Sequence, residues 1–264
     1  AVALAASLKA DVCEIYSDVD GIYTADPRIV PRAHKLAQID IDSMLELSSS
    51  GAKILYIRAV EFARRHQVPL RVRSTFSADA GTLIYTSIEG DNVEEPIVSG
   101  VATDDTQAKI TVVGLPDRPG KAAEVFSVVS EAGANIDMIV QNVSTDENHL
   151  SDISFTLPHS DRHKVVEALK SQQSEVGFQS ISYDDEIGKL SIVGAGMKSS
   201  SGVSAKLFGA LAKAGINIEM ISTSEIRISV VTRADQLKEA TRIVHTAFEL
   251  DAADTAVVYA GTGR

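Results

Sequence analysis

The sequence predicts an α/β layer followed by two copies of an α+β module, and two observations carry this prediction. A helical pattern, a run of strong β-formers and a polar turn follow one another over residues 1–21, an order typical of an α/β layer. KITVVG at 109–114 matches KLSIVG at 189–194, and further matches follow at an offset of 82 residues, which indicates a duplicated module. The matching pairs are Gly120 with Gly202, Phe126 with Phe208, Ala132-Gly133 with Ala214-Gly215, Asn135-Ile136 with Asn217-Ile218, and Met138-Ile139 with Met220-Ile221.

Composition limits the classes of function. The chain has 264 residues with 25 Lys and Arg against 36 Asp and Glu, a formal net charge of −11, and 44% of its residues are hydrophobic. This length suits about two globular domains, while the acidic balance opposes binding to nucleic acid, which relies on clustered Lys and Arg. The single cysteine, Cys13, cannot form an internal disulfide, which suits a reducing, cytoplasmic compartment. No apolar run approaches the roughly 18 residues that span a bilayer, so no membrane partner is expected.

The N-terminal elements follow in order. AVALAASLKAD reads as an amphipathic helix already in progress, so the chain is expected to begin inside a larger domain. A strand is predicted at 12–16, and SDVDG at 17–21 marks a turn after it. The remaining predicted elements are a helix capped by Asp42 and running through Leu47, a helix over 52–66, and strands at 69–73 and 82–85.

Each copy of the repeat reads as strand, helix, strand, strand, helix, strand. That order, βαββαβ, is the ferredoxin-like arrangement, an antiparallel sheet with both helices on one face. Gly133 and Gly215 are predicted to end the first helix of each copy. A further strand is predicted at 97–102, and the sequence leaves open which module it pairs with. The later elements are 152–157, 161–171 and 179–183 in the first copy, and 226–232, 235–248 and 255–260 in the second.

The loop at 115–120, which joins the first strand and first helix of the first copy, is a candidate site for a free amino acid. Unpaired amides at a helix N-terminus suit a carboxylate. Asp117 is placed to accept an ammonium group, and Asn135 with Asp137 would complete a polar rim. The alternative is that Asp117 only caps the helix, whose early turn contains Pro119, and spacing alone favours that alternative.

A second candidate site lies where the 12–16 strand ends. Asp18 and Asp20 stand at its carboxyl end, where open α/β sheets bind ligands. Tyr23, Arg28 and Lys53 add an aromatic surface and two cations suited to a nucleotide. No glycine-rich phosphate loop of the Walker type occurs, and from spacing alone a plain turn is the safer interpretation.

Two other patterns are weaker. Gly194-Ala195-Gly196 with Glu219 imitates a dinucleotide fingerprint, but Ser199 occupies the third glycine position and the repeat partner of this loop lacks the pattern. His159 and His163 have a spacing that suits zinc, but no third ligand lies near them in the sequence, so no metal site is assigned.

Several segments resemble the aspartokinase family. SDVDGIYTADPRIVPRAHKL at 17–36 is similar to that family's nucleotide-binding segment, and SSGAKILYIRAVEFARRHQVPLRVRSTF at 49–76 is similar to the end of its kinase domain. QNVS, NIDM, VGAGMK and EMISTSEIRISVV are similar to the paired ACT domains that follow. The resemblance covers the whole chain. It implies the C-terminal part of an amino-acid-kinase (ATP-binding) domain over 1–90, ACT domain 1 with its preceding strand over 91–184, and ACT domain 2 over 185–264.

The resemblance implies phosphorylation of the β-carboxyl of L-aspartate by ATP with Mg²⁺, and feedback inhibition by threonine and lysine. It also implies a homodimer formed through the ACT domains, or assembly with a full-length kinase subunit. It assigns no catalytic or metal-binding residue to this chain. The residues implied to contact ATP are Ser17, Asp18, Tyr23, Arg28 and Lys53, and those implied to contact an effector are Asp117, Gly120, Lys121, Ala122, Asn135, Ile136, Asp137 and Gln141 of the first copy with Asn217 and Ile218 of the second.

The sequence also departs from the family pattern. The KFGGTS and GRGGSD motifs of the family are absent, so the chain alone is expected to form no aspartyl phosphate. An alternative from another class is a non-catalytic ACT regulatory subunit that binds amino acids, in which the nucleotide-binding residues are only scaffold.

Overall fold

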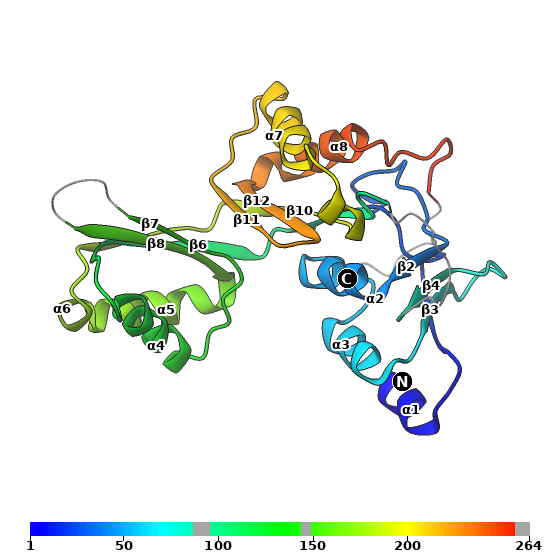
Figure 1. The fold of residues 1–264 in the computed structure, drawn as a ribbon, viewed down its shortest axis with the longest axis horizontal. Helices are drawn as coiled ribbons and strands as arrows, with labels where there is room; N and C mark the ends of the chain where they lie inside the picture. Colours follow the sequence, from blue (N-terminus) through cyan, green and yellow to red (C-terminus); the bar gives the residue numbers. More distant parts are fainter. Residues whose placement is uncertain (87–95, 144–148, 257–264) are drawn as a thin grey trace.

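The computed structural model describes residues 1–86, 96–143 and 149–256, and these residues form three four-stranded sheets (Figure 1). The N-terminal sheet has the strand order β1-β3-β4-β2, in which β1 runs parallel to β3, β3 antiparallel to β4, and β4 parallel to β2. Among the described residues, no helix is long and apolar enough to cross a membrane. The elements of this part are α1 (Val2–Leu8), β1 (Cys13–Ser17), β2 (Gln38–Asp40), α2 (Ile41–Ser49), α3 (Ile57–His66), β3 (Leu70–Ser74) and β4 (Thr82–Tyr85).

Two N-terminal predictions need correction. Asp40, not Asp42, caps α2, because its Oδ1 accepts a hydrogen bond from the backbone N–H of Ser43 at 2.7 Å. Helix α3 begins at Ile57 rather than at residue 52. The turn between the two helices contains Gly51 with φ +113°, and a Cβ there would lie 2.1 Å from the carbonyl oxygen of Thr103. Only glycine fits this turn, which packs directly against a strand from the later part of the chain.

The first module, residues 107–184, has the predicted ferredoxin-like fold. Its sheet has the strand order β7-β8-β6-β9 with every neighbouring pair antiparallel, and helices α4 and α5 cover one face (Figure 1). Helix α4 ends before Gly133, whose φ of +68° confirms the predicted glycine stop. The elements are β6 (Gln107–Pro116), α4 (Lys121–Glu131), β7 (Ile139–Val143), β8 (Leu150–Pro158), α5 (His159–Ser171), α6 (Gln173–Val176) and β9 (Ser180–Asp184).

The second module takes its fourth strand from elsewhere in the chain. Strand β5 (Gly100–Asp104), which precedes the first module, pairs antiparallel with β10, so the strand order is β11-β12-β10-β5. The predicted strand at 97–102 therefore completes the second sheet. Of the predicted closing strand at 255–260, residues 255 and 256 are not in a strand and the others lie outside the described residues. The remaining elements are β10 (Ile187–Val193), α7 (Val203–Lys213), β11 (Met220–Thr223), β12 (Arg227–Arg233) and α8 (Leu237–Ala247).

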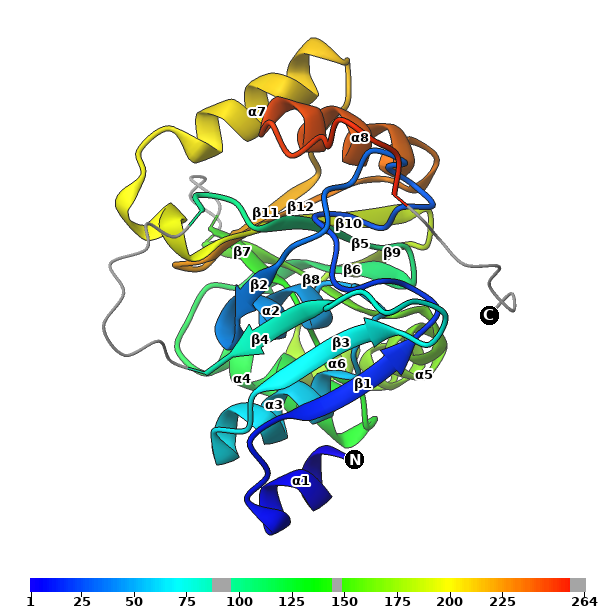
Figure 2. The same cartoon turned by 90° about the vertical axis from the view of Figure 1, so that its right-hand side faces the viewer.

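Strand β10 is buried along its whole length because both faces of its sheet are covered. Leu190 and Ile192 pack beneath α7 and α8. On the opposite face, Val193 joins the core around α2, while Ile187 packs with Met138 of the first module. The second module therefore lies between the N-terminal sheet and the first module, and its sheet stacks on that of the first module (Figures 1 and 2).

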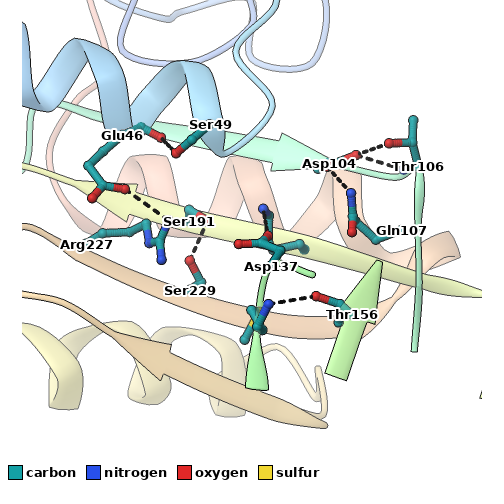
Figure 3. Close-up of polar contacts among 12 residues, drawn as sticks. Glu46, Ser49, Asp104, Thr106, Gln107, Asp137, Thr156, Ser191, Arg227 and Ser229 are labelled. Carbon is teal, nitrogen blue, oxygen red and sulfur yellow. Dashed lines mark hydrogen bonds and ion pairs between the residues drawn. The ribbon is translucent and has the colours of Figure 1, made fainter. Parts of the chain in front are cut away.

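Polar contacts also connect the second module to the N-terminal part and to the first module. Arg227 of β12 donates to Glu46 of α2 at 3.0 Å, and Ser191 pairs with Ser229 at 2.8 Å inside the second sheet (Figure 3). Asp104, at the end of β5, accepts hydrogen bonds from Thr106, which begins the connection to β6. The connection from the second sheet to the first module is thus held by side chains as well as by the backbone.

Two reciprocal ion pairs connect the modules. Lys109 of β6 pairs with Glu219 of the second module, and Lys189 of β10 pairs with Asp137 of the first. The two lysines occupy matching positions in the repeat, as do the two acids, so the modules are related by a local pseudo-twofold axis. The Lys189 side chain is only 2% exposed, and the carboxylates of Asp137 and Asp104 balance its charge. Burial raises the pKa of Asp104, but hydrogen bonds from Thr106 and the charge of Lys189 lower it overall.

Replacing Asp137 with Asn is expected to lower the free energy of unfolding by about 1–3 kcal/mol, because it removes the ion-pair partner of a buried ammonium group and leaves only the Asp104 carboxylate as a nearby counter-charge. Adding Lys189→Met removes that charge and keeps the volume, so the double variant is expected to recover most of the loss. Urea denaturation of the wild type, both single variants and the double variant measures the effect. A double variant as unstable as Asp137→Asn would contradict this account.

Candidate functional site

A long connection follows β1 and lies between the N-terminal sheet and the second module. This connecting loop, residues 18–37, is internally bonded: the carbonyl of Asp26 accepts from the N–H groups of Ile29 and Val30 at 2.9 Å, and its Oδ1 accepts from the N–H of Arg28 at 2.9 Å. The side chain of Asp26 thus forms an Asx turn that fixes the backbone at Arg28.

The structure brings all five residues implied to contact ATP to one cavity. The cavity has a volume of about 370 Å³ and is lined by Ser17 at the end of β1, by Asp18, Tyr23 and Arg28 of the connecting loop, and by Lys53 of the turn between α2 and α3. A strand end, the loop that follows it and a turn more than 20 residues further along the chain therefore supply one site. It lies beyond the carboxyl end of β1, which is where an open α/β sheet binds ligands.

The second module supplies residues of this cavity that sequence reasoning missed. Leu237, Lys238 and Thr241 of α8 line it, together with Thr103 and Asp105 near the end of β5. No local signal marks these residues, because the pattern of α8 is that of an ordinary amphipathic module helix. Only the docking of the connecting loop on α8 reveals that the helix faces the cavity.

A buried polar chain ties the connecting loop to α8. His245 Nε2 lies 2.7 Å from Thr24 Oγ1, and His245 Nδ1 lies 2.9 Å from Asp251 Oδ1. Burial lowers the pKa of His245 below its ordinary value, although the neighbouring Asp251 carboxylate opposes the shift. The neutral ring donates from Nδ1 to Asp251 and accepts at Nε2 from the Thr24 hydroxyl, which also accepts from the N–H of His34 at 2.9 Å.

The cavity is lined by charges of both signs, with the acids Asp18, Asp26 and Asp105 beside three cations, and by an aromatic ring. Arg28, Lys53 and Lys238 supply three cations, and Tyr23 supplies an aromatic ring. Within the described ranges, none of these three cationic side chains forms a hydrogen bond or ion pair with the protein. Asp18 also lines the cavity, and a Mg²⁺ ion bound by phosphates needs only one or two such carboxylates. The residues present therefore fit a metal-bound nucleoside triphosphate.

The candidate effector loop of the first module is exposed and its acid is available. The side chain of Asp117 does not cap α4, whose N-cap is Gly120 with no side-chain hydrogen bond, so the capping alternative is wrong. Lys121 is engaged elsewhere, because its buried ammonium donates to the carbonyl of Val176 at 2.8 Å and to Glu124 at 2.5 Å. Among the described residues the Asp117 carboxylate has no hydrogen-bond or ion-pair partner and lies beside the helix N-terminus, whereas Lys121 points to α6.

The register of the first sheet separates the two halves of the suggested polar rim. Pro116, just before Asp117, lies opposite Leu150, whereas the N–H of Asp137 donates to Thr156, which lies opposite Lys109. Lys109 and Pro116 are at opposite ends of β6, roughly 20 Å apart at the rise of a β-strand. A single chain therefore does not bring Asn135 and Asp137 beside the 115–120 loop, and a pocket using both needs a second chain.

Three other predicted effector residues lie in or just before edge strands. Gln141 lies within β7 and donates weakly to Ser151 at 3.5 Å. Asn217 and Ile218 precede β11, at the end of the second sheet where Glu219 meets Lys109. The structure therefore places Asn217 and Ile218 at the same end of the first module as Asp137. The effector role of all ten predicted residues stays a prediction.

The two weaker sequence patterns have structural explanations. A Cβ at Gly194 would lie 2.3 Å from the carbonyl oxygen of Ile97, so this glycine permits a close backbone approach. Glu219, the acid of the imitated dinucleotide fingerprint, is paired with Lys109. His159 directs Nε2 at the carbonyl of Gln107, and the described part of the chain contains no cluster of three or more possible metal ligands.

Comparison with known families defines the class of protein. The amino acid kinase family model matches residues 1–74, and two ACT domain models match residues 109–173 and 190–248. These matches coincide with the N-terminal sheet and with the two ferredoxin-like modules. The fold and the cavity thus belong to a protein in which a segment of an amino acid kinase is joined to two ACT domains.

Individual relatives identify the family. An aspartokinase from Corynebacterium glutamicum is 56% identical over 264 residues, which is 100% of this chain and 63% of that protein. A solved structure of aspartokinase alpha and beta subunits is 45% identical with a TM-score of 0.54, and the match covers 58% of this chain and 99% of that one. Aspartate kinase from Synechocystis is 39% identical with a TM-score of 0.59, covering 96% of this chain and 45% of that one. The chain belongs to the aspartokinase family, and it spans 63% of the length of the C. glutamicum relative.

Acidification is expected to destabilise the chain through His245. The pKa of His245 in the folded state lies below the ordinary value of 6.5, so the unfolded state binds more protons than the folded state as the pH falls through 6.5. The contribution of His245 to the free energy of unfolding is therefore complete above pH 6.5 and is lost as the pH falls below it. Asp251 changes stability only at lower pH, because hydrogen bonds from Thr246 and His245 outweigh burial and lower its pKa below 3.8. Urea denaturation at pH 7.5 and 5.5 measures the effect.

His245→Asn is the matched variant for this test, because it keeps an N–H donor for Asp251 and does not titrate. It is expected to be less stable at pH 7.5 and to lose less stability than the wild type on acidification. Equal losses in the two proteins would show that His245 does not carry the pH dependence.

Proposed function

We propose that this chain is part of an aspartokinase that transfers the γ-phosphoryl group of ATP, bound with Mg²⁺, to the β-carboxylate of L-aspartate. The observation that supports this most directly is the cavity, because it gathers the five residues that the resemblance implied to contact ATP. The family membership and the fit of the cavity to a nucleotide support the same proposal.

The roles of the residues follow from their chemistry. Tyr23 offers a ring for the nucleobase, while Arg28 and Lys53 offer cationic donors for phosphate oxygens. Bound ATP supplies the phosphoryl group. The Asx turn at Asp26 holds Arg28 in place before binding, so less conformational entropy is lost when the nucleotide binds. These residues bind and orient the nucleotide, and no catalytic residue is assigned within this chain.

We further propose that the ACT modules bind threonine and lysine as feedback inhibitors. The exposed Asp117 carboxylate beside the N-terminus of α4 supports an amino-acid site, since it complements an ammonium group while helix amides complement a carboxylate. An effector that binds one arrangement of the modules more tightly shifts the kinase toward that arrangement, with a coupling of about 1–3 kcal/mol.

We propose that two chains pair through their ACT modules. The separation of the Asp117 loop from the strand starts within one chain supports this proposal. Strands β7 and β11 are also sheet edges, and their matching residues Ile139 and Ile221 are exposed apolar side chains. In such a dimer, the Asp117 loop of one chain would meet Asn217 and Ile218 of the other.

A non-catalytic, amino-acid-binding regulatory subunit is the alternative function. It is favoured by one observation, that the match to the alpha and beta subunit structure covers 99% of that chain but 58% of this one. Titration with ATP distinguishes the two proposals, because saturable binding supports a working nucleotide site and its absence supports the subunit.

Lys53→Ala is expected to weaken ATP binding about tenfold or more, because it removes a charge-assisted contact to phosphate. Isothermal titration calorimetry with Mg²⁺ and ATP measures the dissociation constant. Arg58→Ala, which removes an exposed cation of α3 outside the cavity, is the control and should leave the affinity unchanged. Equal affinities for the wild type and Lys53→Ala would argue against the assigned contact.

Threonine binding is expected to depend on Asp117 and Gln141. Asp117→Ala or Gln141→Ala should weaken it by tenfold or more, as loss of a hydrogen bond to a charged group does. Calorimetric titration with threonine measures this, and Glu131→Ala at the exposed end of α4 is the control. If both variants bind threonine like the wild type, the pocket is wrongly placed.

A further inference from the structure

We propose that Lys238, in the first turn of α8, binds the phosphate groups of the nucleotide, so that the second module supplies part of the nucleotide site. This inference rests on the proposed nucleotide-binding function and extends it to a residue outside the kinase segment. Lys238 lines the same cavity as Arg28 and Lys53.

The geometry of α8 singles out Lys238 within that wall. Leu237 and Thr241 are four residues apart on one face of the helix, both are buried, and the Thr241 hydroxyl donates to the carbonyl of Leu237 at 2.7 Å. These two side chains form the apolar and internally satisfied part of the wall. Lys238 is exposed and lines the cavity, and among the residues that the structure describes its ammonium group has no hydrogen-bond or ion-pair partner, so it is the residue of α8 in this wall that is able to bind an anion.

The charge of Lys238 is unusual for its position. Cations near the beginning of a helix are disfavoured by the helix dipole, and Lys238 is the second residue of α8. Within the described part of the chain Lys238 forms no ion pair, although Asp105 lines the same cavity, whereas neighbouring cations of the second module are paired, Arg233 with Asp184 and Lys189 with Asp137. An anion in the cavity would relieve the repulsion between Lys238 and the helix dipole.

The position of Lys238 relative to the connecting loop is fixed without a ligand. Arg242 of α8 donates to the carbonyl of Ile29 at 2.8 Å, and Thr24 is bonded to His245 at 2.7 Å. Val30 of the loop also packs in the core cluster of α8. The segments that carry Lys238 and Arg28 are therefore held at the same cavity before a nucleotide arrives, which lowers the entropic cost of binding.

The consequence is a direct link between nucleotide and regulatory module. If Lys238 contacts the phosphates, any movement of α8 changes nucleotide affinity, and nucleotide binding biases the position of α8 by the same free energy. The second module then acts on the active site through a shared ligand as well as through the protein.

The test compares the affinities of the wild-type chain, Lys238→Ala and Lys238→Arg for ATP, ADP and adenosine by isothermal titration calorimetry. Lys238→Ala is expected to weaken ATP binding about tenfold, as expected for loss of one charged hydrogen bond. It should weaken ADP binding by a smaller factor or equally and leave adenosine binding unchanged. Lys238→Arg keeps the cation and should retain most of the affinity. Lys213→Ala removes an exposed lysine of α7 outside the cavity and is the control.

Each failure has its own signature. A wild type that binds ATP as tightly as Lys238→Ala overturns this inference and leaves the proposed function standing. An equal loss for adenosine, or an equal loss in Lys213→Ala, also overturns it, because the effect would then not arise from a phosphate contact. A wild type that binds neither ATP nor adenosine overturns the proposed nucleotide site, and this inference with it.

Discussion

The burial of β10 on both faces is the constraint on which the rest of the structure depends. Its residues alternate between the core beneath α7 and α8 and an opposite face that begins with Ile187 and ends with Val193. A ferredoxin-like sheet leaves that second face open, and apolar residues there need a cover. The first module covers one end and α2 covers the other, so the packing of this one strand fixes the order of all three parts.

The same constraint creates the cavity. Because β5 completes the second sheet, the chain between the N-terminal sheet and the first module is held against β10. The connecting loop is bonded to this strand in turn, since the N–H of Val101 in β5 donates to the carbonyl of Thr24 at 2.6 Å. The connecting loop is thereby bonded to the second sheet on one side and to His245 of α8 on the other. The walls of the proposed nucleotide site thus belong to two structural units that share one hydrophobic cluster. A site built this way responds to any movement between them.

The local elements could be predicted from the sequence, and the contacts between elements could not. Periodicity and glycine stops predicted both modules, because helices and strands leave a pattern in neighbouring residues. The partner of β5 is decided by a strand whose paired residues lie 85 to 93 residues later, and nothing near 97–102 records it. Asp40 and Asp42 both precede a helical pattern, and only the hydrogen bond to Ser43 distinguishes them. Lys238 has no motif at all. The reciprocal ion pairs did leave a signal, since lysine and acid recur together at matching positions of the repeat.

The two copies of the duplicated module differ at the loop between the first strand and the first helix. In the first module the loop after β6 is exposed, and no atom of the described chain lies within 4 Å of a Cβ added at Gly120. In the second module the corresponding loop begins at Gly194, where the backbone of Ile97 and Val98 crosses it closely, and a short helical turn at Ala195–Ser199 follows. The chain that delivers β5 therefore crosses the beginning of this loop, while Gly202 at its end, the N-cap of α7, is as open as Gly120. Because both helix N-termini are accessible, the difference between the loops is the acid: Asp117 stands before α4, whereas residues 194–202 contain no Asp or Glu, and the proposed amino-acid site falls on the first module for that reason.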